Sequence, residues 1–319
     1  MRRFIFVGSC GLLSLALFGV IWLALLQPPQ RPAPDLEVER TPERIERGRY
    51  LATHVAGCVQ CHSPTDGSRF GLPVIPGTEG TGGSCVDAAL GFDGRVCAPN
   101  LTPHPTAGVG AWSDGELLRA MREGVDRHGN GLFPRMPYEK FRDFLSDEDA
   151  HAIIAWMRTL PPSDAVTPSR RLPFPLGIVV KFLPAPVPDP VAPALDTPEQ
   201  RGRVVAELAG CPTCHTPIDE RRYPIEGLLL SGGRPYPLPG GGEVTSANLT
   251  PHPDGLGAVE FEAFKQRLRD PARNLAPATP AQRTVMPWAA LAGLTDEDLE
   301  ALWSWLRSVP PLPAHASPR

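Results

Sequence analysis

Apolar residues are unevenly spread along this chain, and their densest run lies at the N-terminus. From Phe4 to Leu26 no residue carries a charge, and two arginines stand just before the run. As a helix, this run would extend about 34 Å, which is enough to cross a bilayer. The arginines would stay in the cytoplasm and deliver the rest of the chain outside. We therefore predict a transmembrane anchor in residues 1–27. A cleaved signal peptide, or a lipoprotein signal ending at Cys10, is the alternative.

Two amphipathic helices further along share the same start and stop signals. Each begins with a hydroxyl residue and three acidic residues, in Ser146–Asp149 and Thr295–Asp298, which indicates an N-cap and an acidic first turn. Each ends before a pair of prolines, which do not continue a helix. The apolar residues between these signals have the spacing of a buried helical face, so we interpret them as core. They are Ile153, Ile154, Trp156, Met157 and Leu160 in the first helix, and Leu299, Leu302, Trp303, Leu306 and Val309 in the second.

A second pair of helices is predicted ahead of these, and each contains an interior glycine. Thr41 and Thr197 are both followed by Pro-Glu, so each indicates an N-cap with proline at the first helical position. Gly48 and Gly202 then fall inside the helices, where glycine costs about 1 kcal/mol. This cost indicates a close approach by another backbone. The last helix of the same half of the chain is the expected neighbour.

Composition and repetition predict the fold class. The chain has 319 residues and 40 prolines, and this proline content argues against a sheet-dominated core. We predict an all-α fold of short helices joined by stiff loops. Because the helical pattern occurs twice, we predict a first domain in residues 41–162, a proline-rich linker in residues 163–196 and a second domain in residues 197–312. The net charge of −4 and the lack of a Lys/Arg-rich run argue against nucleic acid as a partner.

Each predicted domain carries the motif Cys-x-x-Cys-His, at Cys58–His62 and at Cys211–His215. This is the attachment motif of a c-type haem. The two thiols can reach the two vinyl groups of one porphyrin, and the next residue supplies an imidazole for the iron. A thioredoxin-like redox pair would not need the histidine, and a zinc site would need a second pair of ligands close by in each repeat. We therefore predict two covalently attached haem c groups. The predicted attachment residues are Cys58, Cys61, Cys211 and Cys214, and the predicted iron ligands are His62 and His215.

A methionine in each repeat is the predicted second axial ligand. Met136 and Met286 each precede a proline and an aromatic residue, upstream of the last helix. Proline restricts the local backbone and so helps to aim the thioether, and a Met–His pair raises the reduction potential of a haem. The rival ligands are His104 and His252, one in each copy of Asn-Leu-Thr-Pro-His-Pro. Bis-histidine ligation would give a lower potential. The other histidines, among them His54, are expected on surfaces or in loops.

Cys85 and Cys97 lie in a glycine-rich loop of the first repeat that the second repeat is interpreted to lack. Outside the cytoplasm these two cysteines are expected to form a disulfide. It would stabilise a loop of this length by about 3 kcal/mol in the chain-entropy model. Two free thiols are the alternative.

Seven segments together resemble a known family. They are Gly48–Leu51, Cys58–His62, Asn100–Gly110, Trp112–Asp114, Gly124–Asp126, Met136–Tyr138 and Leu172–Pro175. In these segments the chain is similar to the membrane-bound multihaem cytochrome c subunits of bacterial dehydrogenases, the group that serves alcohol, aldehyde and gluconate dehydrogenases. The resemblance implies two tandem class I cytochrome c domains, each with three to five helices around one haem. It covers residues 45–250 well and residues 251–312 more loosely. The alcohol dehydrogenase subunits carry three haems, whereas this chain has two motifs.

The resemblance implies an electron carrier, with no catalytic side chain of its own. Such a protein would relay electrons from a membrane-associated dehydrogenase subunit to a terminal oxidase or a soluble cytochrome. A single span would hold it in the cell membrane, with both haem domains on the periplasmic side. Two alternatives stay open: a dihaem enzyme of the peroxidase or thiosulfate dehydrogenase type, and the cytochrome subunit of a haem–copper oxidase. A peroxidase needs an iron that peroxide can reach, and a Met-Pro ligand in both repeats argues against it.

Overall fold

The structure is a computed structural model. Most of the predicted anchor, residues 1–27, lies outside the residues that it describes. Within the described part of the chain, no helix is both long enough and apolar enough to cross a membrane. The described residues are 18, 19, 22, 26–83, 85–88, 91–187, 193–238, 241–270 and 284–315.

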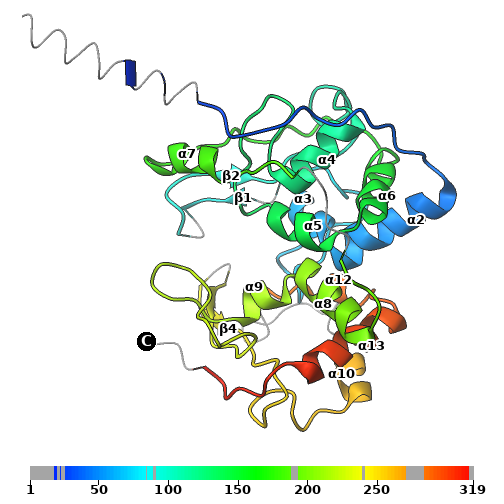
Figure 1. Cartoon of the computed structure of the whole chain (residues 1–319), viewed down its shortest axis with the longest axis vertical. Helices are drawn as coiled ribbons and strands as arrows, with labels where there is room; N and C mark the ends of the chain where they lie inside the picture. Colours follow the sequence, from blue (N-terminus) through cyan, green and yellow to red (C-terminus); the bar gives the residue numbers. More distant parts are fainter. Residues whose placement is uncertain are drawn as a thin grey trace, which may run out of the picture.

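The first repeat is built from short helices joined by loops, the longest of which separates α3 from α4 (Figure 1). Helix α2 (Pro42–Tyr50) begins after the predicted N-cap and continues into a π-helical turn, η1 (Leu51–Val55). The short helix α3 (Cys58–His62) carries the first cysteine motif. The remaining helices of this repeat are α4 (Asp114–Glu123), α5 (Tyr138–Phe144) and α6 (Asp147–Met157).

The second repeat presents its helices in a similar order. Helix α8 (Pro198–Leu208) leads into α9 (Cys211–His215), which carries the second cysteine motif. Further along come α10 (Phe261–Arg269), α12 (Trp288–Leu291) and α13 (Asp296–Ser308). Between the two repeats, α7 (Leu176–Val179) and the 3-10 turn η3 (Val180–Phe182) lie in the predicted linker.

The all-α prediction is wrong, because each repeat also contains a small antiparallel sheet. Strand β1 (Cys85–Val86) pairs with β2 (Val96–Cys97), and β3 (Pro235–Pro237) pairs with β4 (Glu243–Thr245). In both hairpins the first residue of one strand faces the last residue of the other. Both strands of such a ribbon are edge strands, where proline is tolerated. A high proline content therefore argues against a large sheet but not against these hairpins.

A helix crossing lies at the centre of each repeat, within one hydrophobic core that takes in residues of both. Helix α2 crosses α6, and α8 crosses α13. A Cβ on Gly48 would fall 1.8 Å from the carbonyl oxygen of Ala152, and a Cβ on Gly202 would fall 1.8 Å from that of Ala301. The predicted close approach of the first and last helices is thus confirmed in both repeats.

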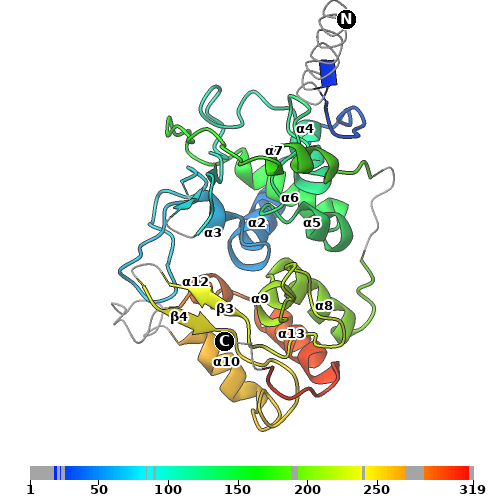
Figure 2. The same cartoon turned by 90° about the vertical axis from the view of Figure 1, so that its left-hand side faces the viewer.

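The two repeats contact each other through two matched pairs of helices (Figure 2). Helix α5 packs against α8, and α12 packs against η1. In each pair, the helix that follows a Met-Pro sequence lies against the helix that precedes the Cys-x-x-Cys-His motif of the other repeat.

Candidate functional site

Each Cys-x-x-Cys-His motif forms a five-residue helix that starts after a left-handed glycine. Gly57 has a φ of 62° and Gly210 a φ of 77°, a conformation in which a side chain would be strained. In both motifs the first cysteine is partly buried, the second is exposed, and neither thiol is in a disulfide. Burial raises the pKa of Cys58 and Cys211 to about 12, so both stay as thiols at neutral pH.

The histidine of each motif is buried and oriented by a backbone carbonyl. His62 is 7% exposed and His215 is 8% exposed. Nδ1–H of His62 donates to the Pro99 carbonyl oxygen at 2.8 Å, and Nδ1–H of His215 donates to that of Ala247 at 2.7 Å. With the proton on Nδ1, the Nε2 lone pair of each ring is left to bind a metal. Burial also lowers the pKa of both histidines, which favours the neutral form that acts as a ligand.

A buried asparagine fixes the loop that supplies each of these carbonyl groups. Asn100 and Asn248 come directly after the two carbonyl residues. The side-chain oxygen of Asn100 accepts hydrogen bonds from the N–H and hydroxyl of Thr102, and Asn248 makes the same pair of bonds with Thr250. The side-chain nitrogen of Asn100 donates to two backbone carbonyls beyond the last helix of its repeat, and that of Asn248 donates to one. The loop that orients each histidine is thereby fixed to the segment that follows the last helix of its repeat.

Met136 and Met286 lie in turns of the same shape. The N–H of Tyr138 donates to the Met136 carbonyl at 2.8 Å, and the N–H of Trp288 donates to the Met286 carbonyl at 2.9 Å. The prolines between them have φ and ψ of −82° and 52° in the first repeat and −79° and 63° in the second. These values describe an inverse γ-turn. Both methionines pack against the hydrophobic core. The second repeat therefore keeps this turn although its surrounding sequence differs.

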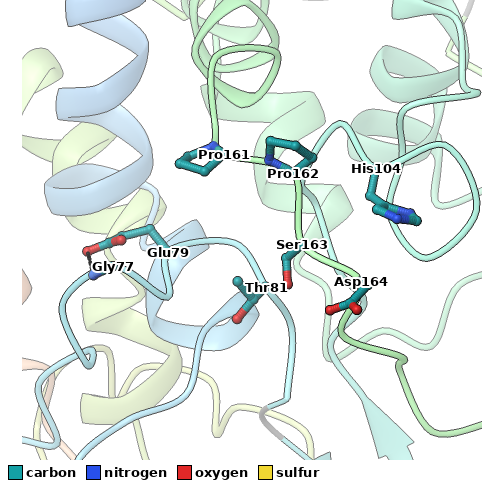
Figure 3. A pocket seen from close by; sticks show the side chains of 8 residues that line it. All are labelled: Gly77, Glu79, Thr81, His104, Pro161, Pro162, Ser163 and Asp164. Atoms are coloured by element: carbon teal, nitrogen blue, oxygen red, sulfur yellow. Dashed lines mark hydrogen bonds between the residues drawn. The ribbon is translucent and has the colours of Figure 1, made fainter.

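The rival ligands use Nδ1 as a hydrogen-bond acceptor. Nδ1 of His104 accepts from the N–H of Ala107 at 3.0 Å, and Nδ1 of His252 accepts from the N–H of Asp254 at 3.1 Å. A neutral imidazole that accepts at Nδ1 carries its proton on Nε2, which then has no lone pair for a metal. Figure 3 shows His104 at the edge of a surface pocket that it shares with Pro161 and Pro162, which follow α6 in the chain. This hydrogen bonding favours the methionines as ligands over these histidines.

The charge of a residue next to Met136 acts on the cysteine motif of the same repeat. The pKa of the Cys61 thiol is raised by desolvation, and the guanidinium of Arg135, the residue before Met136, partly offsets the rise. Cys58 and Met136 also pack against the same core. In the second repeat, the motif cysteine Cys211 and its methionine likewise pack against that core.

The hairpin of each repeat is held in a different way. A disulfide between Cys85 and Cys97 joins β1 to β2. In the second repeat, Arg234 and the hydroxyl of Tyr236 donate to carbonyl oxygens within α9, at 2.6 and 3.3 Å. The Arg234 guanidinium also lies over the ring of Tyr236, 5.2 Å from its centre. The second repeat thus has a counterpart of the cysteine loop, contrary to the interpretation from sequence, and side-chain hydrogen bonds tie that counterpart to the motif helix.

His54 is an interface residue that sequence reasoning missed by expecting it on a surface or in a loop. Its Nδ1–H donates at 2.8 Å to the carbonyl oxygen of Ala290, in α12 of the other repeat. Burial lowers the pKa of His54, the bond to Ala290 opposes this, and Arg49 adds to the lowering. A Cβ on Gly293 would fall 2.0 Å from the ring, so only a glycine leaves room for it. No local pattern reveals this role, because Ala290 lies 236 residues further along the chain.

The residues present in each repeat fit one c-type haem. Two unlinked thiols on one short helix would hold the ring, and a buried imidazole with its Nε2 lone pair available would bind the iron. A thioether in a restricted turn would complete the coordination. In the part of the chain that the structure describes, no group of three His, Cys, Asp or Glu side chains is arranged to bind a metal ion by itself.

Comparison with known proteins finds relatives with cytochrome names, although no protein-family model matches the chain. The chain is 31% identical to the gluconate 2-dehydrogenase cytochrome c subunit of Pantoea cypripedii, over 83% of this chain and 59% of that protein. It is 29% identical to the fructose dehydrogenase cytochrome subunit of Gluconobacter japonicus, over 83% of this chain and 52% of that protein. It therefore spans just over half the length of these two relatives. A diheme cytochrome c-type protein of Cereibacter sphaeroides is 28% identical over 97% of this chain and 99% of its own length.

Proposed function

We propose that this chain, a relative of the cytochrome c subunits of gluconate, fructose and alcohol dehydrogenases, is a dihaem c-type cytochrome. In this proposal it passes electrons from a dehydrogenase subunit to an oxidase or a soluble cytochrome. The kinship agrees with the family that the sequence motifs indicated. It also agrees with the role of a cytochrome component rather than of a catalytic subunit. The near full-length match to a diheme protein supports the number of two haems.

The matched setting of His62 and His215 is the observation that carries the proposal. Both rings are buried, and both donate from Nδ1 to the carbonyl of the residue before a buried asparagine. A metal-binding histidine commonly donates its other ring N–H to a carbonyl in this way, which orients the ring and selects the tautomer. Because both histidines have this arrangement, it supports two equivalent haem sites rather than one haem site and one that has lost its function.

The residues around each motif have separate tasks in this proposal. Bound haem would supply an iron that takes up and releases one electron at a time. The cysteines would fix the ring to the short helix, and the carbonyl partner keeps the imidazole aimed at one point. The thioethers of Met136 and Met286 would stabilise the reduced iron and so raise its potential. The hydrophobic core keeps water away and so helps to set that potential. One electron enters and one leaves, so no acid–base side chain is required.

The dehydrogenase partner and the extracytoplasmic location are part of the proposal. The relatives are named as subunits of gluconate, fructose and alcohol dehydrogenases, which supports a dehydrogenase as the electron donor. The disulfide between Cys85 and Cys97 supports an oxidising compartment, since such bonds are rare where thiols are kept reduced.

Counting the haems tests the proposal most simply. We expect the purified holoprotein to contain two haems per chain in a pyridine haemochrome assay. We also expect its denatured mass to exceed that of the polypeptide by two haem groups. Changing both Cys58 and Cys61 to alanine should leave one attached haem, and the matched change at Cys211 and Cys214 should leave the other. A purified protein with one haem or none would overturn the proposal.

Carbon monoxide separates the electron carrier from a dihaem peroxidase. A reduced iron that keeps its methionine offers carbon monoxide no open position, so we expect the spectrum of the reduced protein to stay unchanged when the gas is added. Ready binding to one haem, together with turnover of peroxide, would instead identify an enzyme. Copurification of the tagged chain with a dehydrogenase subunit, and its reduction on addition of that enzyme's substrate, would test the partner.

A further inference from the structure

The contact surfaces between the two repeats use equivalent positions of the sequence. Glu207 and His54 each lie four residues before the first cysteine of a motif, and each reaches across to the other repeat. Their partners, Lys140 and Ala290, each lie four residues after a predicted methionine ligand. Four residues are about one helical turn. The interface therefore follows a twofold pattern: the helix that precedes the motif of one repeat packs against the helix that follows the methionine of the other.

The contact between α5 and α8 is an ion pair with an aromatic neighbour. Nζ of Lys140 pairs with Oε2 of Glu207, whose side chain is 10% exposed. The guanidinium of Arg203, one turn earlier in α8, lies 5.5 Å from the ring centre of Phe144 at the end of α5. Because Glu207 is largely buried, loss of Lys140 would leave the Glu207 charge without compensation. Helix α5 is thus held at two points by the helix that leads into Cys211.

The contact between η1 and α12 is a hydrogen bond in a tightly packed setting. His54 donates to the Ala290 carbonyl oxygen, and Gly293 allows its ring to lie against the end of α12. At the other end of α12, the ring of Trp288 lies 5.9 Å from that of Phe70. Helix α12 is thus held at both ends by residues of the first repeat, on either side of the Cys58–His62 motif.

We propose that His54 and Glu207 are positioning residues for the haem of the opposite repeat. His54 holds α12 and thereby the Met286 turn, and Glu207 holds α5 and thereby the Met136 turn. This inference rests on the proposed function, since it takes the two methionines as iron ligands. A thioether binds haem iron weakly, so its attachment depends on how firmly its turn is held. Loosening either helix is expected to release the methionine at its N-terminal end.

The test uses the full-length holoprotein and the methionine–iron charge-transfer band in its oxidised spectrum. In a Met136→His background the remaining band belongs to the second haem, and in a Met286→His background it belongs to the first. Adding His54→Ala should abolish most of the band in the Met136→His background and leave it intact in the Met286→His background. Adding Glu207→Gln should have the opposite pattern.

The crossed pattern distinguishes this role from a purely local one. Sequence distance alone would make His54, four residues from Cys58, affect the first haem. If His54→Ala weakened the band of the first haem, or changed neither band, the inference would be wrong. His54→Gln retains a side-chain N–H donor and should restore the band of the second haem. If His54→Ala prevents folding, Gly293→Ala is the substitute, because its Cβ would press on the same ring from the other repeat.

Haem content separates a failure of this inference from a failure of the proposed function. A haemochrome assay on each variant should still give two haems per chain. Two haems with unchanged bands in every variant would overturn the positioning role alone. A wild-type protein without haem would overturn the proposed function and this inference with it.

Discussion

Replacing Gly48 by alanine tests the helix crossing at the centre of the first repeat. The new Cβ would fall 1.8 Å from the carbonyl oxygen of Ala152 and 2.9 Å from Cβ of Trp156. Real Cβ atoms essentially never come closer than 3.0 Å to such atoms, so α2 and α6 would have to separate by roughly 1 Å. The Ala152 carbonyl belongs to the backbone of α6 and moves only with that helix.

The expected cost follows from this separation. A gap of about 0.5–1 Å forfeits roughly a quarter to a half of the dispersion energy of each contact across it. Overpacking in cores costs about 1–3 kcal/mol, and we take the upper end because the clash is with backbone. The better helix propensity of alanine returns about 1 kcal/mol. We therefore expect Gly48→Ala to lower the free energy of unfolding by about 2 kcal/mol.

Urea unfolding of the holoprotein, followed by circular dichroism, measures this loss through the midpoint and slope of the transition. Gly202→Ala should cost a similar amount, because its Cβ meets Ala301 at the same 1.8 Å. Gly67→Ala is the matched control, since nothing lies within 4 Å of its Cβ, and it should stay within about 0.5 kcal/mol of wild type. A Gly48→Ala protein as stable as wild type would refute the reasoning.

Three further outcomes are expected. Asn100→Ala should lower the free energy of unfolding by about 3 kcal/mol, because it removes the hydrogen bonds of a side chain that is only 1% exposed. Urea unfolding measures this change, and a loss below about 1 kcal/mol would contradict the prediction. Met136→His should lower the midpoint potential of one haem and spare the other, and a potentiometric titration with two unshifted steps would speak against Met136 as a ligand. As the pH falls from about 7 to 5, the wild-type protein should lose stability more steeply than His54→Gln. Burial lowers the pKa of His54 in the folded protein, so the unfolded chain binds the proton more readily. Parallel pH profiles of the two proteins in urea unfolding would show that His54 is not the cause.

Local signals predicted the helix starts well. The hydroxyls of Thr41, Ser146, Thr197 and Thr295 each accept a hydrogen bond from the N–H three residues later, as the capping pattern indicated. A cap and its partner are close in sequence, so the pattern contains all the information that the bond needs. The interior glycines were equally informative about helix packing. Glycine destabilises a helix, so its presence there indicated a close helix–helix contact that compensates for the cost.

Helical periodicity was less reliable where the apolar face is wide. It predicted Trp303 in the core of the last helix, whereas the structure buries Trp305 against Gly202. Trp303 is less buried and lies 5.0 Å from the ring of Phe264 in α10. Both tryptophans fit an apolar stripe on this helix. Which of them faces the crossing depends on the position of α8, which the spacing within one helix does not contain.

The sequence offers candidates for the reactive residues of the site but not for the groups that support them. The cysteines, histidines and methionines form short motifs that chemistry makes recognisable. The carbonyls of Pro99 and Ala247, which orient the histidines, have no side-chain signature. The contacts between the repeats join residues that are far apart in sequence, such as Lys140 and Glu207. The hairpin in the second repeat was missed because it has no cysteines to mark it.

The contacts that Tyr50 of α2 and His54 of η1 make with the last helices also bear on how the protein folds while it is synthesised. Tyr50 and His54 find partners at Asp298 and Ala290, more than 230 residues later. Synthesis proceeds from the N-terminus, so the first repeat emerges long before the helices that cover it. These long-range contacts form late, because closing so large a loop is entropically costly. A chain cut at residue 287 would keep both cysteine motifs and yet leave Tyr50 and His54 without these partners. Loss of the C-terminal helices would therefore expose residues near the N-terminal end of the first repeat.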